Sequence, residues 1–165
     1  MYRFGNRPLT ADHLYQSTII LFKIDLSIHP ERNIDMQENT PTRPDLTAAA
    51  PEELARYMAE MLWKKQGIDI EVYRTAERTV IADLFVVCTG RSSTHVKALS
   101  DDIVYEMSLS GINAARVEGH DGAAWILVDF GSVLVHIFDR ESREYYRLER
   151  LLGEENKLDV TFSEP

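Results

Sequence analysis

Residues 125–138 read WILVDFGSVLVHIF, two apolar runs on either side of a short break. Trp125–Asp129 and Val133–Phe138 form the runs, and FGS at residues 130–132 separates them. Two strand-like runs joined by a short glycine-containing turn are typical of a β-hairpin. Side chains alternate between the two faces of a strand. One face of the first strand therefore carries Trp125, Leu127 and Asp129, and the other carries Ile126 and Val128.

A helix is expected directly after the hairpin. Asp139 is a residue type that caps helix N-termini, and Gly153 is a typical stop. A step of about 100° per residue defines the two sides of this helix. Its core face carries Tyr145, Leu148 and Leu152. Its polar side carries Arg143, Glu149 and Arg150, and Tyr146 falls there too.

Helix and strand patterns also alternate upstream of the hairpin. A helix is expected from Pro51 to Gly67, with its apolar residues at helical spacing: Leu54, Met58, Met61 and Leu62. Residues 68–73 alternate in the manner of a half-buried strand. Residues 84–88 are continuously apolar, which is typical of a central strand covered on both faces.

A second helix and a short strand complete the pattern. The helix ends at Gly111, and one of its faces carries Val96, Leu99, Ile103 and Met107. The short strand is expected around residues 115–118. Strands interleaved with helices and ending in a hairpin predict an α/β protein, with a mixed β-sheet of about five strands flanked by helices.

Prolines and glycines divide the chain into segments. Five of the six prolines lie at or before Pro51, whereas seven of the eight glycines lie at or after Gly67. We therefore expect an N-terminal extension and linker over residues 1–45, a compact domain over 46–153 and an acidic tail over 154–165. Met36 offers an alternative start, in which case residues 1–35 are not translated.

The chain is acidic, with 27 Asp and Glu against 18 Lys and Arg and a formal net charge of −9. Residues 1–35 hold equal numbers of basic and acidic side chains, so the whole net charge belongs to residues 36–165. This sign opposes non-specific binding to nucleic acid and favours a basic partner. Cys88, the single cysteine, excludes an internal disulfide and fits a reducing compartment, so a cytoplasmic location is expected.

Residues 89–93, TGRSS, join the apolar strand to the second helix. Backbone N–H groups at such a junction can bind phosphate, and this leaves a nucleotide-binding or nucleotidyl-transferring enzyme as an alternative. That chemistry also requires paired carboxylates to hold Mg²⁺, whereas the strands offer only the isolated Asp83 and Asp129. The pattern favours a plain turn in which Ser92 or Ser93 caps the helix.

Catalytic and metal signatures are weak in the rest of the sequence. The five histidines are scattered without metal-ligand spacing, and no Gly-x-Ser-x-Gly turn presents a nucleophile. We expect no catalytic residue, metal or cofactor. His136 is expected to be a hydrogen-bonded structural residue of the hairpin.

Aromatic residues occupy positions where polar ones are expected. Tyr146 lies on the polar side of its helix, Trp125 shares a strand face with Asp129, and Phe130 lies at the turn. Exposed aromatic residues beside charges are typical of protein-binding hot spots. The alternative is that Trp125 and Leu127 are core residues under a helix, and the pattern alone does not separate the two.

Several of these segments resemble the Iojap family, the ribosomal silencing factor S proteins. The resemblance runs roughly from Pro51 to Gly153, in order and with compatible spacing. It is carried by ADLFVVCTG at residues 82–90, by WILVDFG and VLVHIF in the hairpin, and by Ser92, Ser93, His95, Arg143, Tyr146, Leu148, Glu149 and Leu151.

The resemblance implies a fold related to nucleotidyltransferases without their activity. It also implies binding to the fourteenth large-subunit ribosomal protein on the joining face of the large subunit. The small subunit is then blocked, and translation falls when nutrients are short. Family members lack cofactors and some form homodimers, so a homodimer is among the expected partners. The family's contact positions fall on Trp125, Phe130 and Tyr146, to which we add the neighbouring Asp129.

Three positions depart from the usual family pattern. Phe130 stands where leucine is usual, Ser132 where aspartate is common and Leu152 where tryptophan is frequent. Phe130 keeps an apolar contact, whereas Ser132 removes a charge from the turn. A large-subunit maturation factor that never blocks subunit joining is an alternative that the sequence does not separate from silencing.

Overall fold

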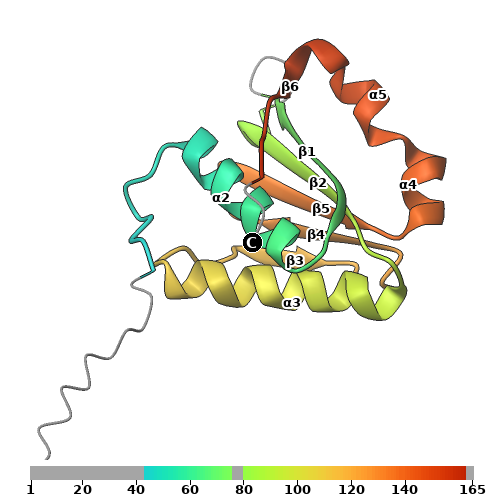
Figure 1. The fold of residues 1–165 in the computed structure, drawn as a ribbon, viewed down its shortest axis with the longest axis horizontal. Helices are drawn as coiled ribbons and strands as arrows, with labels where there is room; N and C mark the ends of the chain where they lie inside the picture. Colours follow the sequence, from blue (N-terminus) through green and yellow to red (C-terminus); the bar gives the residue numbers. More distant parts are fainter. Residues whose placement is uncertain (1–42, 76–79, 163–165) are drawn as a thin grey trace, which may run out of the picture. The chain divides into compact units, whose positions relative to one another are not determined.

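The computed structural model describes residues 43–75 and 80–162. Within Thr42–Pro165, the described residues form one compact unit (Figure 1). Arg43 pairs with Glu106, with 3.0 Å between Nε and Oε2, and Leu46 is buried. The domain therefore includes residues 43–45, which were expected in the extension. The rest of the expected extension lies outside the described residues.

A six-stranded sheet forms the centre of the domain, in the order β3-β4-β5-β2-β1-β6 (Figure 1). The strands are β1 (Ile68–Arg74), β2 (Leu84–Thr89), β3 (Arg116–Glu118), β4 (Trp125–Asp129), β5 (Val133–Phe138) and β6 (Lys157–Leu158). β2 and β5 are parallel, and the other neighbours are antiparallel. The mixed α/β sheet and the β4–β5 hairpin are confirmed, with one strand more than the expected five.

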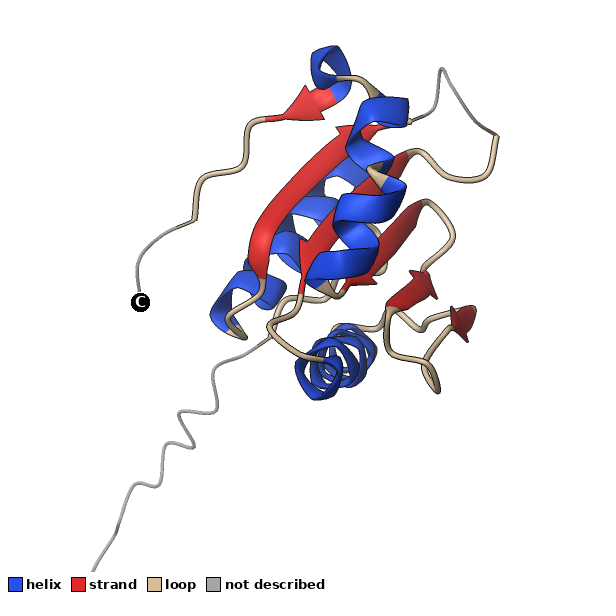
Figure 2. Ribbon diagram, turned by 90° about the vertical axis from the view of Figure 1, so that its right-hand side faces the viewer, coloured by secondary structure: helices blue, strands red, loops and turns tan. Residues whose placement is uncertain are grey.

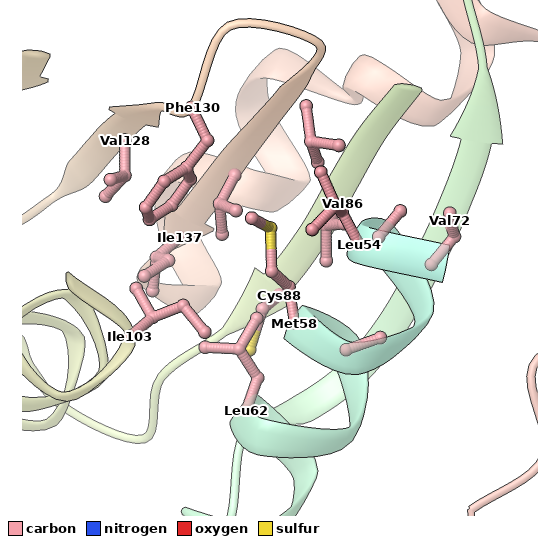
Figure 3. Packing of buried hydrophobic residues seen from close by; sticks show 14 of the residues in the cluster. Leu54, Met58, Leu62, Val72, Val86, Cys88, Ile103, Val128, Phe130 and Ile137 are labelled. Atoms are coloured by element: carbon pink, nitrogen blue, oxygen red, sulfur yellow. The ribbon is translucent and has the colours of Figure 1, made fainter. Parts of the chain in front are cut away.

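Helices pack on both faces of this sheet (Figure 2). The larger core lies under α2 (Pro51–Lys64) and α3 (Ser93–Leu109). Residues at four-residue spacing, Leu54, Met58 and Leu62, bring one stripe of α2 onto the sheet (Figure 3). Every residue of β2 and β5 is buried, as expected of central strands covered on both sides.

A smaller cluster lies on the opposite face. Its buried members are Tyr73, Ala82, Phe85, Val87, Leu134, Phe138 and Leu152. Trp125, Leu127 and Leu148 pack against it while remaining half-buried. Two short helices lie on this side of the sheet, α4 (Arg140–Tyr146) and α5 (Leu148–Leu152). Apolar side chains at its margin are therefore only partly covered.

The continuous helix expected over residues 139–153 is wrong. Asp139 does cap α4, since its Oδ1 accepts a hydrogen bond of 2.7 Å from Ser142 N. Arg147 adopts the left-handed conformation with φ of 47°, and this ends α4 and turns the chain before α5. The turn changes which residues face the sheet, so Tyr145 is 77% exposed instead of belonging to the core, whereas Leu152 is buried as expected.

The acidic tail expected over residues 154–165 is also wrong as far as Phe162. β6 pairs with β1, where Val72 lies opposite the buried Leu158. Phe162 stacks on Trp63 of α2 with ring centroids 5.8 Å apart. A two-residue strand is too short to show the alternation of apolar and polar residues that marks a strand. The acidic composition of residues 154–165 therefore predicted a tail where the chain in fact joins the sheet.

Candidate protein-binding face

Trp125 is the centre of an aromatic surface at the start of β4. Its ring stacks on buried Phe138 with centroids 4.8 Å apart, and Tyr146 of α4 meets it at 5.0 Å. Tyr145 packs edge-on against Tyr146, also at 5.0 Å. We call Trp125, Tyr145 and Tyr146 the aromatic platform. Tyr145 and Tyr146 are 77% and 51% exposed, so the platform is anchored in the smaller core and open on its outer side.

Buried His136 lies beneath this platform. Its Nδ1 accepts a hydrogen bond of 3.3 Å from the indole Nε1 of Trp125, so the neutral ring carries its proton on Nε2. The ring lies 4.7 Å from that of Phe85, and only 5% of the residue is exposed. Burial lowers the pKa of His136 to about 4. The expectation of a hydrogen-bonded structural histidine is confirmed.

Lowering the pH from 7.5 to 4.5 should reduce the free energy of unfolding through His136. The folded pKa of about 4 lies below the ordinary 6.5, so the unfolded chain binds more protons in this window and stability falls as pH falls. The contribution is on the order of 2 kcal/mol. Urea unfolding at both pH values measures it, and His136→Gln should remove this part of the slope. An equal slope in the variant would contradict the assignment.

The structure separates the four expected contact residues. Trp125 and Tyr146 are together, and Asp129 lies on the same strand face, about 13 Å along β4 from Trp125 at about 3.3 Å per residue. Asp129 Oδ1 accepts a hydrogen bond of 2.8 Å from Gly131 N and so fixes the turn. Phe130 is only 8% exposed and packs in the larger core with Val128 (Figure 3). Phe130 therefore lies on the core side of the turn, and its expected role in binding a ribosomal protein stays a prediction.

Tyr145 is the platform residue that sequence reasoning missed. A continuous helix would have turned it toward the core, but the break at Arg147 leaves it beside Tyr146. No glycine or proline marks residue 147, so local composition gave no signal of the break. Leu151, on α5, is also a large apolar residue that is well exposed.

The loop at residues 89–93 is a capped helix start. Ser92 Oγ accepts a hydrogen bond of 3.2 Å from His95 N, which confirms the expected cap. Arg91 N donates to His95 Nδ1 at 3.1 Å, so this backbone donor is also occupied. Within residues 43–75 and 80–162, no three His, Cys, Asp or Glu side chains gather in a way that could hold a metal ion. Burial raises the pKa of Cys88 to about 12, which disfavours the reactive thiolate.

A polar cleft of about 620 Å³ opens between the C-terminal helices and the β1–β6 edge. Glu71 lies in it and accepts hydrogen bonds from Lys157 Nζ at 2.7 Å and from the Tyr73 hydroxyl at 3.0 Å. Burial acts to raise the pKa of Glu71, but these hydrogen bonds and the charges of Lys157 and Arg143 outweigh it and lower the pKa. The Glu71 side of the cleft is thus lined by side chains that already pair with one another.

Comparisons with known proteins identify the family. The family described as ribosomal silencing factor during starvation matches residues 47–165. A ribosomal silencing factor from Bacillus subtilis is 39% identical over 98 residues, 59% of this chain and 83% of that protein. A mouse protein named mitochondrial assembly of ribosomal large subunit protein 1 is 30% identical over 97 residues, 57% of this chain and 42% of that protein.

The fold agrees with these sequence matches. The crystal structure of a protein from Chromobacterium violaceum superposes with a TM-score of 0.62 and 30% identity, covering 70% of this chain and 94% of that one. No helix in the described part of the chain is both long and apolar enough to span a bilayer. Because the family match covers well over half of the sequence, the chain belongs to the RsfS/Iojap family of ribosomal silencing factors.

Proposed function

We propose that this protein binds the large ribosomal subunit in the cytoplasm through the fourteenth large-subunit ribosomal protein. The bound protein occupies the surface on which the small subunit docks and so lowers translation, above all when nutrients are limiting. The observation that carries the proposal is the aromatic platform, because Tyr145 and Tyr146 expose large apolar rings beside a half-buried tryptophan.

The platform has the properties of an interface hot spot. Aromatic side chains give large contact areas at low cost in conformational entropy, and they dominate the measured energy of many interfaces. Trp125 cannot swing freely, since it stacks on Phe138 and donates to His136. A preformed aromatic surface loses little entropy on binding and leaves more of its contact energy as affinity.

Charge favours a basic protein as the partner. The net charge of −9 lies entirely on residues 36–165 and opposes contact with ribosomal RNA phosphates. The same charge steers a basic ribosomal protein toward this domain and accelerates association. Asp129 is assigned to the rim of the contact, and Phe130 supports the turn from the core side.

Sedimentation with purified ribosomal subunits tests this function. The full chain should travel with large subunits and not with small ones, and the isolated fourteenth ribosomal protein should compete for it. Small-subunit binding of equal strength, or large-subunit binding that this competitor leaves unchanged, would contradict the proposal.

Large-subunit maturation is a second candidate, favoured by the name of the mouse relative. Both roles require binding to the large subunit, but they differ in when the protein acts. A maturation factor should bind precursor particles in preference to mature subunits, whereas a silencing factor should bind mature subunits and keep them from joining. Comparing affinity for the two kinds of particle separates the candidates.

A further inference from the structure

Helix α4 carries Tyr146 but contributes no buried residue of its own. A helix of seven residues is far below the length at which isolated helices are stable in water. Tyr146 contacts Trp125, but no residue of α4 is buried in a core, so polar attachments must help to hold this helix in place.

Arg143, in the middle of α4, supplies such an attachment. Its side chain is only 11% exposed. The guanidinium donates to Glu71 Oε2 on β1 at 2.9 Å and to Thr89 Oγ1 at the end of β2 at 2.8 Å. It also donates to the carbonyl of Asp69 and to the carboxylate of Glu149 on α5. One planar group with five donors thus connects α4 to two strands and to the next helix.

The same helix turn positions the platform tyrosine. Tyr146 follows Arg143 by three residues, and its ring contacts Trp125 at 5.0 Å. The carbonyl of Arg143 accepts a hydrogen bond of 2.9 Å from Arg147 N, where α4 ends. The position of Arg143 therefore determines where the end of α4 presents Tyr146.

We propose that Arg143 is the positioning residue of the aromatic platform. Its guanidinium fixes α4 against the ends of β1 and β2 and thereby holds Tyr146 against Trp125. The consequence for ribosome binding rests on the function proposed above. The expected effect of Arg143 on the structure of α4 is independent of that function.

Loss of Arg143 should act locally, because the carboxylate of Glu71 beneath it keeps a second partner. Glu71 keeps Lys157 as a partner at 2.7 Å, so it is not left as an isolated buried charge. The strands beneath are held by the buried apolar clusters, which Arg143 does not join. Local release of α4 can then be distinguished from general unfolding by exchange of backbone amides.

Arg143→Met in the full chain tests the proposal, with Arg140→Met as the matched control. Arg140 belongs to the same helix and is exposed, so its replacement makes the same change in net charge. In Arg143→Met, amides of α4 should exchange at least about tenfold faster while those of β2 and β5 are unchanged. Arg140→Met should leave α4 unchanged. Arg143→Lys should remain defective, because one ammonium group does not reproduce the planar fork.

Large-subunit affinity provides the second readout. It should fall about tenfold in Arg143→Met and stay within about twofold in Arg140→Met. The proposal is overturned if α4 exchange is unchanged, if β2 exchange rises by the same factor, or if affinity is unchanged while Trp125→Ala weakens it about 30-fold. Full binding by Trp125→Ala would instead refute the proposed function, and amide exchange would still decide whether Arg143 positions α4.

Discussion

Replacing Trp125 with alanine should weaken binding to the large ribosomal subunit about 30-fold, a loss of about 2 kcal/mol. The substitution removes the central ring of the platform and leaves Tyr146 without its neighbour. Tyr146→Ala should have an effect of the same order. A titration of labelled protein with purified large subunits measures both affinities.

Tyr105→Ala is the matched control for these variants. Tyr105 is 60% exposed but belongs to α3, which packs on the opposite face of the sheet. Its loss should change affinity less than about twofold. Because Trp125 also stacks on buried Phe138, its loss can lower the stability of the fold as well as the affinity for the ribosome. Tyr146 is more exposed, so Tyr146→Ala tests the loss of the binding contact with less effect on folding. Equal losses from Tyr105→Ala and Tyr146→Ala would refute the assigned surface.

Deleting the chain from Lys157 onward should lower the free energy of unfolding by about 4 kcal/mol. The deletion removes buried Leu158, the pairing of β6 with β1 and the stack of Phe162 on Trp63. It also removes a hydrogen bond of 2.7 Å from Arg56 to the carbonyl of Asp159. Urea unfolding of the full and shortened chains measures the difference.

Single substitutions refine this test. Leu158→Ala should cost about 2–3 kcal/mol, because it leaves a cavity beside β1. Thr161→Ala, at an exposed position in the same segment, should change stability by less than about 0.5 kcal/mol. A shortened chain as stable as the full one would show that this segment is a tail after all.

The fold was predictable where the hydrophobic pattern is long and unambiguous. Alternation in β4, the continuous apolar run of β2 and the helical spacing in α3 each span enough residues to show a period. β6 has two residues, and no period exists over that length. The break between α4 and α5 depends on the left-handed backbone conformation of Arg147. Arginine rarely adopts this conformation, so the sequence did not predict the break.

The sequence made the proximity of the aromatic pair Trp125 and Tyr146 predictable, but not the burial of Phe130. Trp125 and Tyr146 stand out because each is a large aromatic residue among polar ones, and the structure brings them together. Phe130 was assigned to the contact surface because the family resemblance places a contact position there, at the turn. The alternation of β4 continues through that position, so Phe130 falls on the core side with Ile126 and Val128.

The most direct test of the account is whether the bound protein prevents subunit joining. Purified large subunits are first saturated with the full chain, small subunits are then added, and gradient sedimentation measures the fraction of assembled ribosomes. The account predicts that this fraction falls in proportion to the occupied large subunits. At about ten times the Kd of the full chain, a 30-fold weaker Trp125→Ala occupies only about a quarter of the large subunits, so most of them should still join. Full joining by large subunits that still carry the protein would contradict it.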